Sequence, residues 1–379
     1  MFLNEKERSI MYMIKIMNIF LIFSCFVSIF SSNERESLPS RLYNLDLNSI
    51  AKKNNIVPIV VIGSGPAGLT AALYGRRGGM HTVVFTGNLP GGQLTQTTYI
   101  ENWPGIKKAF ANDIMDGLFE QARDFGVTII EDVITSVDFD KWPFVLNTES
   151  GDKINALSII ISTGAAPRKL GVEGELDYWG RGVSSCAVCD CHFFKDRDVA
   201  IVGGGDSAVE EAMQLAPYAK NIFILVRDVN MKATKTLRDK LEDFENIKVI
   251  YNKQVLKVLG DGELVNGLEV KDSITQEVST MKVDGLFLAI GQNPNTELFE
   301  KSLSLNKFGY ITIDPVTQET SVKGVFAAGD VEDAEYRQAI VAAAAGCKSA
   351  LRAVKWLREI GLTDKNIKNL SKNYFSYKD

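Results

Sequence analysis

Short apolar runs recur along this chain, and each is followed directly by glycine. The runs cover residues 59–62, 158–163, 199–202, 285–290 and 324–328. A continuous apolar run of this length, closed by a turn residue, is typical of a strand covered on both faces. The first and third runs lead into helical patterns at 69–74 and 209–216. Strand, glycine turn and helix in this order predict an α/β fold.

The N-terminal 55 residues follow a different pattern. Residues 16–30 are apolar and lie behind the basic residues Lys6, Arg8 and Lys15. This stretch is shorter than the roughly 20 residues that span a bilayer, and it suits the core of a signal peptide. Residues 33–55 are rich in Ser, Asn and Lys without periodicity, which is typical of a linker or transit segment.

We therefore expect a signal-like segment over 1–32, entry into the secretory route, and onward passage to a plastid-like organelle. A retained anchor is the alternative, and any membrane contact would be made through this segment alone. Translation from an internal methionine would instead leave the protein cytoplasmic or mitochondrial. The candidate internal starts are Met11, Met13 and Met17.

Composition narrows the function classes. The 379 residues allow two domains, and 45% hydrophobic with 23% charged residues is ordinary for a globular protein. A net charge of −5 argues against nucleic acid as a partner, because phosphate binding requires a basic face. The two histidines, His81 and His192, exclude a multi-histidine metal centre and disfavour a Ser-His-Asp hydrolase.

Two glycine-rich loops stand between a predicted strand and a predicted helix. Residues 63–68 read Gly-Ser-Gly-Pro-Ala-Gly, and residues 203–208 read Gly-Gly-Gly-Asp-Ser-Ala. In this context the first glycine allows the tight turn, the second lets the backbone approach a pyrophosphate, and the third position packs helix on strand. Two copies in one chain predict two dinucleotide sites.

The residues beyond the two loops differ. The strand after the second loop ends at Arg227, and Lys232 and Lys235 follow, which favours NADPH because cations bind its 2′-phosphate. Asp228 adds an opposing negative charge. The strand after the first loop ends at Thr86 without an acid, so a flavin dinucleotide suits that site better than NAD.

Three of the five cysteines fall within residues 186–191. The pair Cys186-x-x-Cys189 can close into a small disulfide ring, and thiols in such pairs often have lowered pKa values. Zinc bound by Cys186, Cys189, Cys191 and His192 is the alternative, although structural zinc sites normally draw on two separated ligand pairs. Asp190 could shuttle protons to the dithiol or cap a helix. We expect Cys191 to be a spare thiol and Cys347 to be a buried free cysteine.

These segments closely resemble the low-molecular-weight thioredoxin reductases over about residues 56–360. The segments that carry the resemblance are GSGPAG at 63–68, PGGQLTQTT at 90–98, ENWPG at 101–105, CAVCD at 186–190, and AAGDV with YRQA near 327–339. The resemblance implies two Rossmann-like domains, with the NADPH domain (167–294) inserted into a discontinuous FAD domain (56–166 and 295–379).

The resemblance also implies the site residues. In the family the cysteine matching Cys189 faces the flavin, the one matching Cys186 attacks the thioredoxin disulfide, and the aspartate matching Asp190 is the acid–base. NADPH is held by residues matching Gly203, Gly204, Gly205, Asp206, Ser207, Arg227 and Lys232. FAD is held by residues matching Gly63, Ser64, Gly65, Pro66, Ala67, Thr86, Gly91, Gly92, Gln93, Asn102, Val133, Asp330, Arg337, Gln338 and Ala339.

Family members are homodimers whose inserted domain rotates, so that NADPH and the dithiol meet the flavin in turn. This chain departs from the family at Asp228, at Cys191 and in the alanine-rich stretch 342–346. We expect a thioredoxin-disulfide reductase with FAD and NADPH as cofactors. A flavin-dependent dithiol oxidase of a secretory compartment and a non-enzymatic flavin- or zinc-binding interaction protein are the alternatives.

Overall fold

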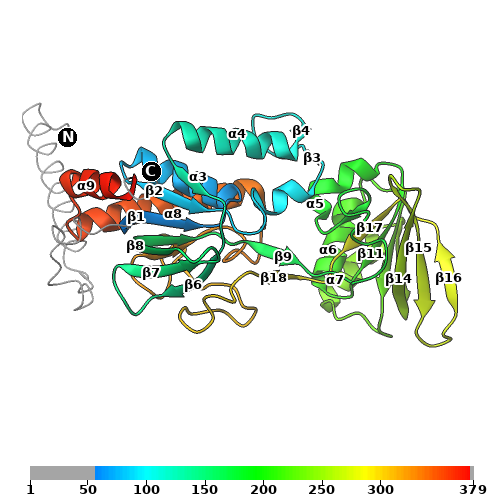
Figure 1. Cartoon of the computed structure of the whole chain (residues 1–379). Helices are drawn as coiled ribbons and strands as arrows, with labels where there is room; N and C mark the ends of the chain where they lie inside the picture. Colours follow the sequence, from blue (N-terminus) through cyan, green and yellow to red (C-terminus); the bar gives the residue numbers. More distant parts are fainter. Residues whose placement is uncertain (1–55, 376–379) are drawn as a thin grey trace, which may run out of the picture. The chain divides into compact units, whose positions relative to one another are not determined.

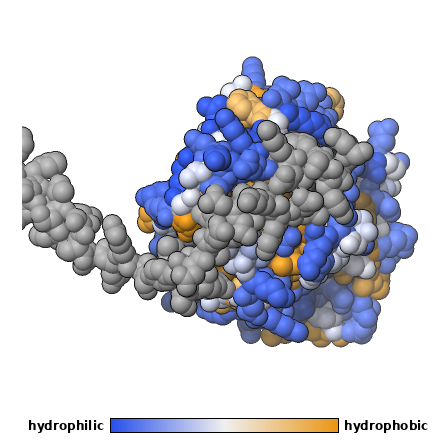
Figure 2. Space-filling model, turned by 60° about the vertical axis from the view of Figure 1, so that its left-hand side comes forward, coloured by the Kyte–Doolittle hydropathy of each residue, from blue (hydrophilic) through white to orange (hydrophobic). Residues whose placement is uncertain are grey.

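The computed structural model describes residues 56–375, which belong to one compact unit (Figure 1). The expected signal-like segment 1–32 and linker 33–55 lie outside the described residues. Among residues 56–375, no helix is both long enough and apolar enough to cross a membrane. The face shown in Figure 2 is mainly hydrophilic, with small scattered apolar areas.

The first sheet has seven strands in the order β5-β2-β1-β8-β7-β6, with β19 paired to β8. Strands β5, β2, β1, β8 and β19 are parallel, whereas β7 and β6 join as antiparallel neighbours. The strands are β1 (Ile56–Ile62), β2 (Thr82–Phe85), β5 (Thr128–Ile130), β6 (Ile134–Asp138), β7 (Phe144–Thr148), β8 (Lys153–Ile161) and β19 (Val325–Ala327).

All seven residues of β1 are buried, as its unbroken apolar sequence predicts for the centre of a parallel sheet. Helices α3 (Pro66–Arg77) and α8 (Ala339–Glu359) contact each other closely and pack on this sheet. A Cβ atom on Gly346 of α8 would lie 2.1 Å from the carbonyl oxygen of Ala67, so glycine lets the two helices meet. Helices α4 (Ala111–Asp124) and α9 (Asp364–Phe375) complete this part.

The second sheet is entirely parallel, in the order β10-β17-β11-β12-β13. A three-stranded antiparallel sheet packs against it through a shared apolar cluster that includes Ala200, Leu225, Leu268 and Leu286. The strands are β10 (Val183–Ser184), β11 (Asp198–Val202), β12 (Asn221–Val226), β13 (Ile247–Tyr251), β14 (Lys253–Gly260), β15 (Val265–Asp272), β16 (Val278–Met281) and β17 (Gly285–Leu288). The helices here are α5 (Ala187–Asp190), α6 (Asp206–Leu215) and α7 (Lys235–Lys240), with 3₁₀ turns η3 (Cys191–Phe194) and η4 (Leu241–Asp243).

The second sheet is an insertion in the first. Strand β19 follows the whole second sheet in sequence and still pairs with β8, at Phe326 opposite Ile160. The chain leaves the first part through β9 (Ala165–Pro167) and returns through β18 (Gln292–Pro294), and these two strands pair antiparallel (Figure 1). The architecture is therefore two Rossmann-like domains, one inserted into the other. The domain limits near 166 and 294 remain predictions, and they fall in or directly beside these two strands.

Candidate active site

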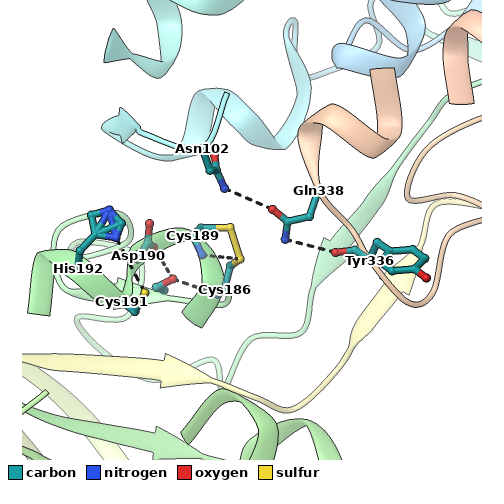
Figure 3. Close-up of a disulfide and its surroundings, with 9 residues drawn as sticks. Asn102, Cys186, Cys189, Asp190, Cys191, His192, Tyr336 and Gln338 are labelled. Atoms are coloured by element: carbon teal, nitrogen blue, oxygen red, sulfur yellow. Dashed lines mark hydrogen bonds between the residues drawn. A yellow bond between two sulfur atoms is a disulfide. The ribbon is translucent and has the colours of Figure 1, made fainter. Parts of the chain in front are cut away.

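The redox pair stands at the start of a short helix behind β10. Cys186 and Cys189 form a disulfide (Figure 3). The backbone N–H of Cys189 donates to Sγ of Cys186 at 3.3 Å, because Cys186 occupies the N-cap position of α5. A donor aimed at this sulfur stabilises a thiolate there once the disulfide opens. The disulfide occupies two of the four ligands that the zinc alternative requires, and within residues 56–375 no group of three or more His, Cys, Asp or Glu side chains is arranged to hold a metal ion.

Asp190 is tied to the disulfide through Ser184. The Ser184 hydroxyl donates to Oδ2 of Asp190 at 2.6 Å and accepts from the Cys186 N–H at 3.1 Å. Burial raises the pKa of Asp190 above its ordinary value, and the Ser184 hydrogen bond and His192 oppose this shift. The Asp190 side chain makes no capping hydrogen bond to η3 and contacts Ser184 instead, and its carboxyl retains a proton more readily than an exposed aspartate.

The disulfide opens onto a cavity of about 680 Å³. Ligand pockets commonly enclose about 300–1,000 Å³. The expected site residues that line it are Gly63, Ser64, Gly65, Pro66, Ala67, Thr86, Gly92, Gln93, Asn102, Val133, Cys186, Cys189, Asp190, Ser207, Asp330, Arg337, Gln338 and Ala339. The structure thus brings the flavin residues named from the resemblance together with the dithiol.

The first glycine loop forms a cradle that lies too close to the backbone of Ser162 to admit a side chain at its first position. A Cβ atom on Gly63 would lie 2.3 Å from the carbonyl oxygen of Ser162, and Gly63 has a φ of +109°. Helix α3 begins at Pro66, and no side chain caps its N-terminus at Gly65. Free N–H groups at a helix N-terminus bind phosphate, so this cradle fits the pyrophosphate of FAD.

Side chains around the cradle complete the fit. The Ser64 hydroxyl donates to the carbonyl of Thr86 at 3.2 Å and accepts from the Gly91 N–H at 3.0 Å. Gly91 is not among the residues that line the cavity, and its part in the site is this contact with Ser64. Burial raises the pKa of Asp330 to about 6, and the charge of Arg337 opposes part of this rise. Asp333 stabilises the turn that follows Asp330, because its carboxylate accepts hydrogen bonds from the N–H groups of residues 335–337.

Opposite the disulfide, two segments far apart in sequence meet at one contact. The Asn102 amide donates to Oε1 of Gln338 at 3.3 Å, and the Gln338 amide donates to the carbonyl of Tyr336 (Figure 3). Asn102 belongs to the segment behind β3 (Tyr99–Ile100), whereas Gln338 precedes α8. The short elements η2 (Gly92–Gln96) and β4 (Ala109–Phe110) precede and follow Asn102 along the chain.

The second glycine loop lies at the carboxyl end of β11. A Cβ atom on Gly203 would lie 2.5 Å from the carbonyl oxygen of Ala289, and α6 begins at Asp206 without a side-chain cap at Gly205. This geometry fits a second pyrophosphate. Of the expected NADPH residues, Ser207 lines the cavity, and the others are not among its lining residues: Gly203, Gly204, Gly205, Asp206, Arg227 and Lys232.

Glu211 lines the cavity but was not predicted from the sequence, and Cys347 differs from its predicted burial. Oε2 of Glu211 is shielded from solvent without a hydrogen-bond partner among the described residues, and burial raises its pKa to about 8. The sequence feature that could have indicated Glu211 is its carboxylate, which lies on the helix that follows the second glycine loop. Cys347 is free but only half-buried, because its position on α8 turns partly away from the core. Cys191 is a buried free thiol, as expected of a spare cysteine.

A disulfide beside two dinucleotide cradles defines a dinucleotide-dependent disulfide oxidoreductase. Residues 57–346 match the family model of the pyridine nucleotide-disulphide oxidoreductases. The chain is 42% identical to thioredoxin reductase of Rickettsia typhi over 79% of this chain and 98% of that protein. It is also 42% identical to thioredoxin reductase 2 of Arabidopsis thaliana, over 80% of this chain and 82% of that protein.

Solved structures give the same result. Thioredoxin reductase from Giardia duodenalis superposes with a TM-score of 0.76 at 37% identity, covering 80% of this chain and 99% of that one. The chain belongs to the pyridine nucleotide-disulphide oxidoreductase family and, within it, to the thioredoxin reductases. FAD and NADPH are the cofactors of this family.

Proposed function

We propose that this chain reduces the disulfide of a thioredoxin, with electrons passing from NADPH through FAD to the Cys186–Cys189 pair. The observation that carries the proposal is that the disulfide lines the same cavity as the Gly63–Ala67 cradle. In net terms NADPH is oxidised, one proton is consumed, and the thioredoxin disulfide becomes a dithiol.

When bound, FAD supplies the two-electron exchange between the nicotinamide and the protein disulfide. The residues of the chain do the rest. The S–S bond between Cys186 and Cys189 opens on receiving two electrons and one proton, and the sulfurs then exist as thiol and thiolate. The Cys189 N–H, which already donates to Sγ of Cys186, favours the thiolate on Cys186.

Thiolate Cys186 attacks the thioredoxin disulfide and forms a mixed disulfide. The thioredoxin sulfur that leaves in this first step takes a proton from Asp190, and the resulting carboxylate accepts the thiol proton of Cys189. Deprotonated Cys189 then attacks Sγ of Cys186, which releases the second thioredoxin sulfur and restores the Cys186–Cys189 bond. Asp190 gives a proton to the leaving sulfur, since its raised pKa keeps a proton available and Ser184 holds the carboxyl at the redox loop. The assignment of the two sulfurs rests on the family resemblance.

Replacing Cys186 with serine tests this route. Flavin reduction by NADPH should survive in Cys186→Ser, because it does not use that sulfur, whereas thioredoxin reduction should be abolished. Cys347→Ser is the matched control, since Cys347 is free and lies on α8 away from the redox pair, and it should retain both activities. Thioredoxin reduction that persists in Cys186→Ser would contradict the proposal.

The flavin site and the assembly state belong to the same proposal. We infer that the flavin residues implied by the family resemblance, Gly91 included, hold FAD and that the second glycine loop with Arg227 and Lys232 holds NADPH. From the family resemblance we also infer a homodimer. Analytical ultracentrifugation of the FAD-loaded protein should give twice the chain mass of 41.8 kDa, and a monomer at micromolar concentration would overturn that inference.

For the N-terminal residues, we propose entry into the secretory route and passage to a plastid-like organelle. The apolar stretch 16–30 behind basic residues supports this proposal. A fluorescent reporter carrying residues 1–55 should reach such an organelle, and the same reporter lacking residues 1–32 should remain in the cytoplasm. A cytoplasmic or mitochondrial signal from the full segment would contradict this route.

A further inference from the structure

Three charged side chains gather at the carboxyl end of β12. Arg227 and Asp228 follow the strand directly, and Lys232 lies four residues further on. Oδ2 of Asp228 lies 3.7 Å from Nε of Arg227 and 3.9 Å from Nζ of Lys232. One carboxylate oxygen thus faces both cations that the proposed function assigns to the 2′-phosphate of NADPH.

The segment that carries these charges is fastened to the nucleotide loop. The N–H groups of Lys232 and Ala233 donate to the carbonyl of Gly204, at 2.6 and 2.9 Å. Met231 and Ala233, the residues on either side of Lys232, are buried in the hydrophobic core of this domain. Because the N–H groups of Lys232 and Ala233 are anchored on Gly204, the backbone of Lys232 is held beside the glycine loop and its side chain starts from there.

A second acid near the loop is already engaged. Oδ1 of Asp206 accepts from the N–H of Thr234 at 2.6 Å, which closes the far end of the same segment. Asp228 instead meets side-chain cations only at salt-bridge distance, and about half of its side chain is exposed. Its carboxylate is therefore accessible to a bound ribose.

The position of Asp228 has a chemical meaning. In Rossmann folds an acid at the end of the second strand accepts from the ribose 2′-hydroxyl of NAD, whereas a cation there binds the 2′-phosphate of NADP. This chain carries both kinds of group at one strand end. A 2′-phosphate between Arg227 and Lys232 would compete with Asp228 for both cations and would meet its negative charge, whereas a 2′-hydroxyl can donate to it.

We propose that Asp228 is a specificity-determining residue that lowers the preference of this enzyme for NADPH over NADH. The inference rests on the proposed function, because it assigns the second glycine loop to the nicotinamide nucleotide. Asp228 acts in two ways: it neutralises part of the charge that attracts a 2′-phosphate, and it offers an acceptor to a 2′-hydroxyl.

The test measures binding rather than turnover. The FAD-loaded full chain is titrated calorimetrically with 2′,5′-ADP, which carries the 2′-phosphate, and with 5′-AMP, which lacks it, and neither ligand can reduce the flavin. Asp228→Asn should tighten 2′,5′-ADP by about tenfold, as expected when one like charge leaves a phosphate site. It should leave 5′-AMP unchanged or bind it a few-fold more weakly.

Asp239→Asn is the matched control, because it removes the same charge from an exposed position on α7. It should move neither affinity. The gain in Asp228→Asn should also shrink as the salt concentration rises, since these charges are exposed.

The outcomes separate the two proposals. If Asp228→Asn leaves the 2′,5′-ADP affinity unchanged, or tightens both ligands equally, Asp228 does not determine specificity, whatever the enzyme reduces. If neither nucleotide binds to the unaltered chain, the loop is not a nucleotide site and both proposals fail. Failure to reduce thioredoxin, with the predicted binding shift intact, would overturn the proposed function alone.

Discussion

Nε2 of His192 lies 2.7 Å from Oε2 of Glu101, and this contact joins the segment behind the redox disulfide to the segment behind β3. Glu101 also pairs with Lys108 at 2.8 Å, and Nζ of Lys108 lies 5.2 Å from the ring centroid of Phe193. Two adjacent residues of η3 are thus held by the β3–β4 region. This contact holds η3, which follows the redox disulfide directly, against the β3–β4 region.

Breaking this contact should slow the enzyme modestly. Glu101→Gln and His192→Gln should each lower thioredoxin turnover about twofold to fivefold, because a partly exposed ion pair contributes about 0.2–1 kcal/mol. The double variant should be no slower than the slower single one, since both changes remove the same contact. Bound FAD, measured by absorbance, should be unchanged, and strictly multiplicative rate losses would show that the two residues act independently.

Displacing the first glycine loop should prevent flavin binding. Gly63→Ala would place its Cβ 2.3 Å from a backbone oxygen at a φ of +109°, so the loop must move. We expect purified Gly63→Ala to be colourless. Gly117→Ala is the control, because Gly117 lies in α4 with open space around it. It should bind FAD normally and be more stable by about 0.5–1 kcal/mol. A yellow Gly63→Ala protein with full flavin content would refute the cradle.

Removing the proton donor at the redox loop should change both rate and pH dependence. Asp190→Asn should lower thioredoxin turnover by about 10²-fold or more, the usual contribution of general acid–base catalysis. In the unaltered enzyme the rate should fall as rising pH takes the proton from Asp190, whose pKa burial raises. This descending limb should vanish in Asp190→Asn. Asp177→Asn, an exposed aspartate of the same domain, should keep it.

Glu211 predicts a pH dependence of stability. Burial raises its pKa from 4.5 to about 8, so the folded protein holds a proton that the unfolded chain releases between those values. Its contribution to stability is therefore complete below about pH 4.5 and is lost as the pH rises through about 8. As the pH rises from 6 to 9, the free energy of unfolding of Glu211→Gln should gain about 1–3 kcal/mol relative to that of the unaltered protein.

The neighbouring Glu210→Gln provides the comparison for this measurement, since Glu210 is exposed. Urea unfolding of the FAD-loaded protein at pH 6 and pH 9 should show a smaller gain for Glu210→Gln, because the charge of Glu210 contributes less than burial to the raised pKa of Glu211. An equal gain for the two variants would mean that net charge, rather than the buried carboxyl of Glu211, controls the effect.

Much of the fold could be predicted because its signals are local. The strands at 59–62 and 199–202, their glycine turns and the helices that follow all appear where the apolar pattern places them. The insertion of one domain into the other was implied by the family resemblance. It is the pairing of β19 with β8 that establishes it, because strand pairing joins residues more than 160 positions apart.

The features of the candidate site are likewise of two kinds, those with local sequence signals and those without. The sequence by itself determined the redox pair, both glycine loops and the unusual Arg227-Asp228 step, since each depends on neighbouring residues and on the steric freedom of glycine. Only the tertiary structure decided that Glu211 is buried, that His192 meets Glu101, that Cys347 is half-exposed, and that Asp228 faces two cations at once. Burial and charge pairing arise from segments that folding brings together, so no local pattern records them.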